Sequence, residues 1–154
     1  MIPRDVREKM STWVFGCDVC QEVCPYTRAA TDEPDPAFLP RHLDNAYPSL
    51  YRLLAMSNRT FRELYRGTAV MRARRAGLAR NAAVALGNIG TEEDVPHLAR
   101  AALGHDEALV RGHAAWALGR IGGSHARRAL SRVWERERDL EARAEITLAL
   151  EGAA

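Results

Sequence analysis

A repeat of 32 residues constrains the fold of this chain more than any other feature of its sequence. The segment AVALGNIG at residues 83–90 recurs as AWALGRIG at 115–122, and a related TLALEGA follows at 147–153. Small residues and leucines that return at such a period indicate stacked pairs of helices, in which each pair leaves an apolar face that the next pair covers. The chain is therefore expected to be mostly α, with an α-solenoid of short helix pairs over residues 49–154.

The repeat also predicts where the helices end and where they pack. Helices are expected near residues 49–56, 58–66, 68–76, 78–89, 92–103, 107–120, 124–136 and 139–151. The tightest contacts are expected at repeated small and apolar positions, namely Ala83, Ala85, Leu86 and Ile89 with their equivalents Ala115, Ala117, Leu118 and Ile121. Gly90 and the pair Gly122–Gly123 stand where helix ends favour left-handed residues, and Thr91 is placed to cap the next helix. These loops resemble those of short, alanine-rich HEAT-like repeats.

All three cysteines of the chain lie in the segment FGCDVCQEVCPYT, residues 15–27. Cys17, Cys20 and Cys24, followed by Pro25, match the last three cysteines and the proline of the C-x2-C-x2-C-x3-C-P motif of two-cluster bacterial ferredoxins, while Val14 stands at the first position. Thiolates are soft ligands that suit iron–sulfur clusters. The spacing predicts a partial 4Fe–4S segment at residues 1–30, in which Cys17 and Cys20 bind one cube and Cys24 another. The proline-rich residues 31–48 are expected to be an irregular connector.

Two other interpretations of the cysteines stay open. They could be three buried structural thiols, or they could form a zinc site with a histidine such as His42, because tetrahedral Cys3His sites exist. The sequence begins without the apolar core of a secretory signal, so the cytoplasm is the expected compartment. In the cytoplasm, clustered cysteines bind metals more often than they form disulfides. No apolar run approaches the roughly 20 residues that span a membrane.

Positive charge is concentrated in one block of the sequence. Residues 61–90 contain six arginines and a single acid, Glu63, although the net charge of the whole chain is only +2. Such a block is typical of a surface that binds phosphate backbones, and a solvated face with no ligand is the alternative. The candidate nucleic-acid contacts are Arg66, Arg72, Arg74, Arg75 and Arg80.

Taken in order, several segments resemble the C-terminal part of tRNA epoxyqueuosine reductase. They are IPRDVREKM, FGCDVCQEVCPYTRAA, FLPR and FRELYRGTAVMRARRAGLARNAAVALGN, and the resemblance covers about residues 2–122. It implies an enzyme with two 4Fe–4S clusters and a cobalamin-binding catalytic domain, which reduces epoxyqueuosine to queuosine at the wobble position of tRNA. The resemblance implies that the other cluster ligands and the N-terminal catalytic half would precede Met1. The chain would then be a fragment, a split-gene product or a truncated gene product, with tRNA as its partner.

A second function from another class is a non-catalytic HEAT-like interaction module with a vestigial or zinc-binding cysteine segment. No Ser/His/Asp constellation, phosphate loop or dinucleotide-binding motif is present. Trp116 and Trp134 occupy apolar helical positions and are expected in the core. The histidines His97, His105, His113 and His125 are expected at the surface or at helix edges.

Overall fold

The computed structural model describes residues 1–29, 35–36, 39–40 and 43–152, and His42 with much of the expected connector lies outside them. Every regular element within these residues is helical, which confirms the mostly α prediction. The α-helices are α1 (Arg4–Arg7), α2 (Val19–Glu22), α3 (Leu43–Ala46), α4 (Leu50–Ala55), α5 (Asn58–Tyr65), α6 (Arg74–Ile89), α7 (Val95–Gly104), α8 (Ala108–Ile121), α9 (Gly123–Arg136) and α10 (Leu140–Gly152). The 3-10 turns are η1 (Glu8–Met10), η2 (Thr27–Ala29), η4 (Ala69–Ala73) and η5 (Glu92–Asp94).

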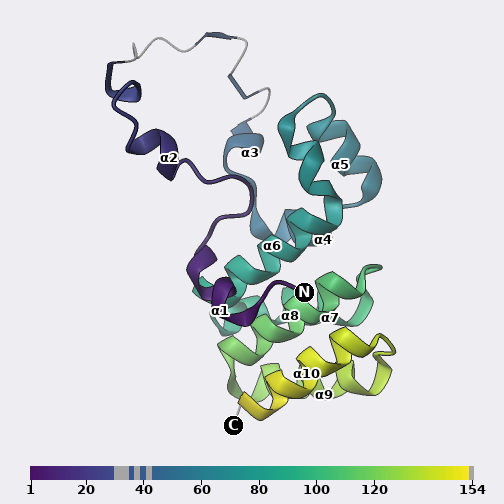
Figure 1. Ribbon diagram of the computed structural model, residues 1–154. Coiled ribbons are helices and arrows are strands. Elements are labelled where there is room, and N and C mark those ends of the chain that lie inside the picture. Colours follow the sequence, from purple (N-terminus) through teal and green to yellow (C-terminus); the bar gives the residue numbers. More distant parts are fainter. Residues whose placement is uncertain (30–34, 37–38, 41–42, 153–154) are drawn as a thin grey trace.

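Helix α4 and helices α6 to α10 form two layers (Figure 1). Helices α6, α8 and α10 pack side by side in one layer, and α4, α7 and α9 cover one side of it. The core between the layers is built from small and branched residues, including Ala82, Leu98, Val110, Leu118 and Ile146, all of which are fully buried or nearly so. Each pair therefore covers the apolar face of the preceding pair, as the repeat predicts.

Glycines of the repeat set the distance between helices of the α6–α8–α10 layer. A Cβ atom on Gly87 would lie 2.5 Å from Cζ3 of Trp116, and one on Gly119 would lie 2.8 Å from Cβ of Ala149. The two glycines stand at the same repeat position, so α6 approaches α8 as α8 approaches α10. Most of the expected packing residues are buried, but Ile89 is 56% exposed and the expectation for it is wrong.

The start of α6 also differs from the expected pattern. Separate helices were expected on either side of Gly77, but α6 runs without a break from Arg74 to Ile89. Glycine inside a helix costs only about 1 kcal/mol relative to alanine, and the buried Leu78, Ala79 and Ala82 that follow it hold the helix in place. The break falls instead at Arg74, whose φ is 58°.

The loops confirm two of three expectations. Gly122 and Gly123 have φ values of 70° and 82°, the left-handed region that favours glycine. Thr91 forms a capping box with Asp94, and its backbone N–H donates to Asp94 Oδ2 at 2.7 Å. Gly90 is not left-handed, because its φ is −70°. It is needed for space, since a Cβ there would lie 2.2 Å from the carbonyl oxygen of Leu86.

An arginine near the start of each helix in the α6–α8–α10 layer ties it to a loop. Arg75 of α6 pairs with Asp106 at 3.1 Å, across the gap to the next repeat. Arg111 of α8 binds both carboxylate oxygens of Glu137, at 2.7 and 2.8 Å. Arg143 of α10, 32 residues after Arg111, donates to the carbonyl oxygen of Glu137 at 3.0 Å. Successive repeats are thus joined by charge as well as by apolar packing.

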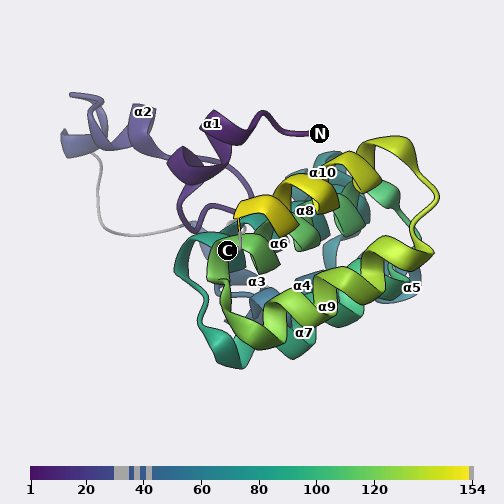
Figure 2. The same cartoon turned by 90° about the horizontal axis from the view of Figure 1, so that it is seen from below.

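The N-terminal segment, residues 1–14, lies across the α6–α8–α10 layer on the side away from α7 and α9 (Figure 2). Its Arg7 is 1% exposed and binds Glu145 of α10, while its guanidinium carbon lies 5.4 Å from the ring of Trp116 in α8. The backbone N–H of Ile2 donates to Nε2 of His113, which is fully buried. His113 therefore corrects the expectation of a surface histidine, because it accepts a backbone hydrogen bond from a segment far away in the sequence.

Trp134 corrects another expectation, since it is 41% exposed and lies outside the core. The guanidinium of Arg143 stacks over its ring at 4.2 Å, so the indole packs against a cation on the surface of the α9–α10 pair. Trp116 is buried, as expected.

Candidate functional site

The three cysteines lie on a part of the chain that leaves the helical layers. After Val14 the chain runs outward, and α2 lies away from the repeats in both views (Figures 1 and 2). We call residues 15–29 the cysteine arm. Cys20 is in the single turn of α2, and the backbone N–H of Cys24 donates to the carbonyl oxygen of Gln21 at 3.1 Å. Pro25 follows, and proline lacks the N–H that a continuing helix needs.

The thiols of the cysteine arm are accessible. Cys17 and Cys20 are exposed and Cys24 is half-buried, so the interpretation as three buried structural thiols is wrong. Backbone N–H groups of Thr27 and Tyr26 lower the pKa of Cys24 from its ordinary value, which favours the thiolate that binds metals. Among the described residues, no three His, Cys, Asp or Glu side chains gather closely enough to hold a metal ion. The cysteines thus offer soft donors without a complete ligand set, and the proposed zinc partner His42 lies outside the described residues.

Several apolar side chains that stand near the cysteines in the sequence are exposed. Trp13 and Phe15 are 49% and 44% exposed, and Val23 and Tyr26 in the cysteine arm are more exposed still. Apolar groups gathered on one projecting segment are typical of a surface that another protein part covers.

The arginine block separates into two sets. Arg66, Arg72 and Arg74 are exposed, and Arg74 begins α6 with its unusual backbone angle. Arg75 is 8% exposed, and its guanidinium donates to Asn58 and to the carbonyl oxygen of Met56 as well as to Asp106. Arg80 is half-buried, and its Nε donates to Asn81 Oδ1 at 3.0 Å. The first set can reach a phosphate from solution, whereas the second set makes contacts inside the protein.

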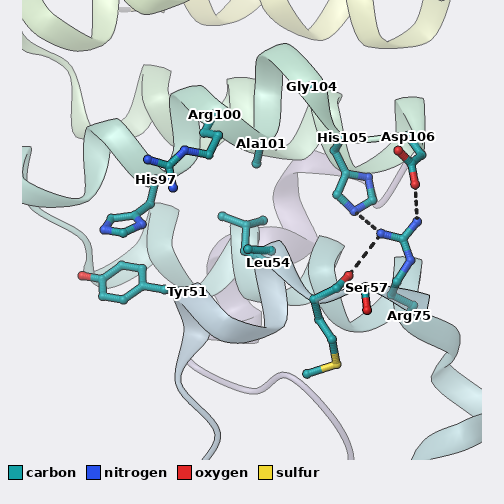
Figure 3. A pocket seen from close by; sticks show the side chains of 12 residues that line it. Tyr51, Leu54, Ser57, Arg75, His97, Arg100, Ala101, Gly104, His105 and Asp106 are labelled. Atoms are coloured by element: carbon teal, nitrogen blue, oxygen red, sulfur yellow. Dashed lines mark hydrogen bonds and ion pairs between the residues drawn. The ribbon is translucent and has the colours of Figure 1, made fainter. Parts of the chain in front are cut away.

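A cavity of about 300 Å³ opens beside Arg75, between α4 and α7 (Figure 3). Tyr51 stacks on His97 with ring centroids 4.1 Å apart, and the Tyr51 hydroxyl donates to Asp94. Arg75 points toward Asp106 and toward His105, whose Nε2 lies 3.0 Å from NH1 of Arg75. Burial and then the charge of Arg75 lower the pKa of His105, so this imidazole is neutral near pH 7.

Sequence reasoning missed this cavity. Its lining comes from α4, α6, α7 and the loops between them, and no single stretch of the sequence carries a motif for it. The one available signal was the pair of histidines His97 and His105, which stand eight residues apart and both face the same cavity.

The chain is similar to HEAT-repeat proteins and to epoxyqueuosine reductases. A family model described as HEAT repeats matches residues 68–151. The epoxyqueuosine reductase of Bacillus cereus is 34% identical over 156 residues, which covers 97% of this chain and 39% of that protein. A crystal structure of a selenomethionine-labelled epoxyqueuosine reductase has a TM-score of 0.90 and 32% identity, and the match covers 100% of this chain and 41% of that one.

A further solved structure is an epoxyqueuosine reductase with a tRNA-Tyr stem loop that carries epoxyqueuosine. It has a TM-score of 0.90 and 32% identity, over 99% of this chain and 40% of that chain. The chain thus spans about two fifths of the length of each of these epoxyqueuosine reductases. None of the described helices combines the length and the apolar character that crossing a membrane requires.

Proposed function

The chain belongs to the HEAT-repeat family and is homologous over nearly its full length to the C-terminal part of epoxyqueuosine reductases, and from this premise we propose that it serves in such an enzyme. Its activity would be the reduction of epoxyqueuosine to queuosine at the wobble position of tRNA. The chain would contribute cluster ligands and a tRNA-binding surface, and a cobalamin-binding catalytic part would act with it. The observation that carries the proposal is that the likeness covers the cysteine arm and the repeats together, over 100% of the chain.

The cysteine arm is proposed to supply ligands to two 4Fe–4S clusters. Cys17 and Cys20 would bind one cluster and Cys24 the other, following the ferredoxin-type spacing. The exposed thiols and the exposed apolar groups beside them fit this role, because they leave room for ligands and apolar cover from another part of the enzyme. When bound, such clusters carry single electrons, and the chain's own residues hold the thiolates in place.

The tRNA surface is proposed to centre on Arg66, Arg72 and Arg74. The three side chains are exposed, and Glu63 is the only acid in residues 61–90. Glu63 is already paired with Arg59 at 2.8 Å, so it does little to offset the block. Arg75 and Arg80, which the sequence also indicated as nucleic-acid contacts, are expected to stabilise the fold rather than to contact phosphate.

The test is a salt titration of tRNA binding by the whole protein in which this chain occurs. Changing Arg66, Arg72 and Arg74 to Glu should weaken binding and should flatten the slope of log affinity against log salt by about two to three, since each phosphate contact contributes roughly 0.7–0.9. The matched control changes Arg128, Arg132 and Arg136 to Glu, which are exposed arginines of α9. Equal losses in both variants, or an unchanged slope in the first, would mean that the block is only a solvated face.

A further inference from the structure

We propose that Asn81 and Asn88 of α6 are positioning residues, which hold the backbone that leads into Cys17 and so fix where the thiols are presented. The geometric part of this inference stands on contacts within the chain. Its consequence for a cluster rests on the proposed function.

Asn88 binds the N-terminal segment at two points. Its Nδ2 donates to the carbonyl oxygens of Arg7 and Ser11, each at 2.9 Å. An amide nitrogen carries two hydrogens, so both are used, and both partners are backbone oxygens that can only accept. The contact therefore holds the course of the chain through η1, whatever side chains stand there.

Asn81 binds the same segment at its end. Its Nδ2 donates to the carbonyl oxygen of Val14 at 2.8 Å, and its Oδ1 accepts from Nε of Arg80. The arginine thereby sets the orientation of the amide, which gives the half-buried Arg80 a structural role. Asn81 and Asn88 are seven residues apart, about two helical turns, so they lie on the same face of α6.

The backbone at one of the residues that Asn88 binds is held in an unfavourable conformation. Ser11 has a φ of 48°, a region that residues other than glycine seldom occupy and that costs free energy when they do. Asn88 accordingly bonds to the carbonyl of Ser11 itself. Without these contacts the chain would be expected to relax at Ser11 and to carry the following residues with it.

The distance from the last contact to the first thiol is short. Cys17 comes three residues after Val14, which limits the reach between them to about 10 Å of extended chain. Val14 packs partly buried against the core, whereas Cys17 is exposed. Val14 is thus the last of the residues bound by Asn81 and Asn88 before Cys17.

The experiment measures the distance between the cysteine arm and the repeats by pulsed spin-label resonance. One label is placed on Cys17, with Cys20→Ser and Cys24→Ser, and the other on Glu135→Cys, an exposed position of α9. Asn81→Asp with Asn88→Asp replaces the donors by oxygens that repel the carbonyls. We expect a single narrow distance distribution to become broad. Ser124→Asp with Ser131→Asp adds the same charge on α9 and should leave the distribution narrow.

Hydrogen exchange gives a second readout. Amides of residues 8–14 should exchange about ten-fold faster for each hydrogen bond lost, which corresponds to about 1.4 kcal/mol, while the amides of residues 114–118 in α8 stay protected. If those α8 amides also lose protection, the aspartates have disturbed the repeats themselves, and the uncharged pair Asn81→Leu and Asn88→Leu is used in their place.

An unchanged distance distribution in a folded variant overturns the positioning role. Whether the thiols then bind iron is a separate measurement, and its failure would count against the proposed function alone.

Discussion

Arg7 and Glu145 lie 138 residues apart in the sequence and form a buried, two-pronged ion pair, with NH2–Oε1 and NH1–Oε2 distances of 2.7 and 2.9 Å. Arg4 adds a second guanidinium at 2.9 Å from Oε2. Burial raises the pKa of the Glu145 carboxyl, but the hydrogen bonds from Arg7 and Arg4 outweigh it and hold that pKa below its ordinary value. The N-terminal segment is therefore fastened to the last helix.

Glu145→Ala should destabilise the chain by about 3–5 kcal/mol, because it leaves the buried guanidinium of Arg7 without its carboxylate. Urea unfolding measures the loss. The matched control is Glu63→Ala, which removes an exposed pair with Arg59 that is expected to contribute about 0.3–0.5 kcal/mol. Similar small losses in both variants would contradict the structural importance of the Arg7–Glu145 pair.

Gly119→Ala should destabilise the α8–α10 contact by roughly 1–3 kcal/mol, the usual cost of overpacking. The added Cβ would lie 3.0 Å from Cα of Ala149, and a backbone atom cannot move aside as a flexible side chain can. Gly104→Ala is the control, since a Cβ there meets nothing within 4 Å. Thermal unfolding of both variants decides the matter, and equal melting temperatures would refute the close approach.

His113 should make folding less favourable as the pH falls below neutrality. Burial lowers the pKa of His113 from 6.5 to about 4, so between these values the unfolded chain binds a proton that the folded chain does not. Stability should fall by roughly 2–4 kcal/mol from pH 6.5 to about 4 and then level off with respect to this group. His113→Gln should reduce that slope. Part of the pH dependence of stability should remain in this variant, because the pKa of His105 is also lowered. An unaltered slope in the variant would argue against a neutral buried His113.

Protonation of Glu137 should destabilise the chain in a lower pH range than protonation of His113 does. The hydrogen bonds from Arg111 lower its pKa from 4.5 to about 2, with help from the backbone N–H groups of Arg138 and Asp139. Its contribution to stability is therefore fully present above pH 4.5 and is lost as the pH falls toward 2. Glu137→Gln should be less stable than the wild type at neutral pH, and the difference should shrink across that interval. A difference that stays constant down to pH 2 would show that the charge of Glu137 is not what stabilises the loop.

Under the proposed ligation Cys17 and Cys24 belong to different cubes, so Cys17→Ala and Cys24→Ala should damage different clusters in the whole protein. Paramagnetic resonance of the reduced protein should show an unequal loss of two signals. Identical loss of one signal in both variants would refute the crossed assignment. A chain that takes up no iron at all would favour the non-catalytic interaction module.

The sequence predicted those parts of the fold that periodic or local features indicate. Repeated leucines and alanines located the stacked helices, and Thr91 located a helix start, because these signals are local or recur at a fixed spacing. The burial of Arg75 could not be predicted in this way, since Asp106 and His105 reach it from the next repeat. An exposed arginine and a buried one look alike in a charged block.

The sequence also gave no indication that the N-terminal segment packs across the helices of the repeats. His113, Glu145 and Asn88 each stand at an ordinary helical position, and their partners lie 77 to 141 residues away in the sequence. Pairing over such distances leaves no period to detect. Trp134 is exposed although it stands at an apolar helical position, and the arginine that stacks on its ring comes from the next helix.

Arg7 touches three helices of the layer at once, with its carbonyl on Asn88 of α6, its guanidinium on Glu145 of α10 and its charge beside Trp116 of α8. In most repeat arrays each unit contacts only its neighbours, so the ends fray before the middle melts. One residue that bonds to α6 and α10 together removes this independence, because α10 cannot separate without breaking the contacts of a segment that α6 also holds. The repeats should therefore unfold cooperatively in one transition, and loss of Arg7 should divide that transition into steps that begin at α9 and α10.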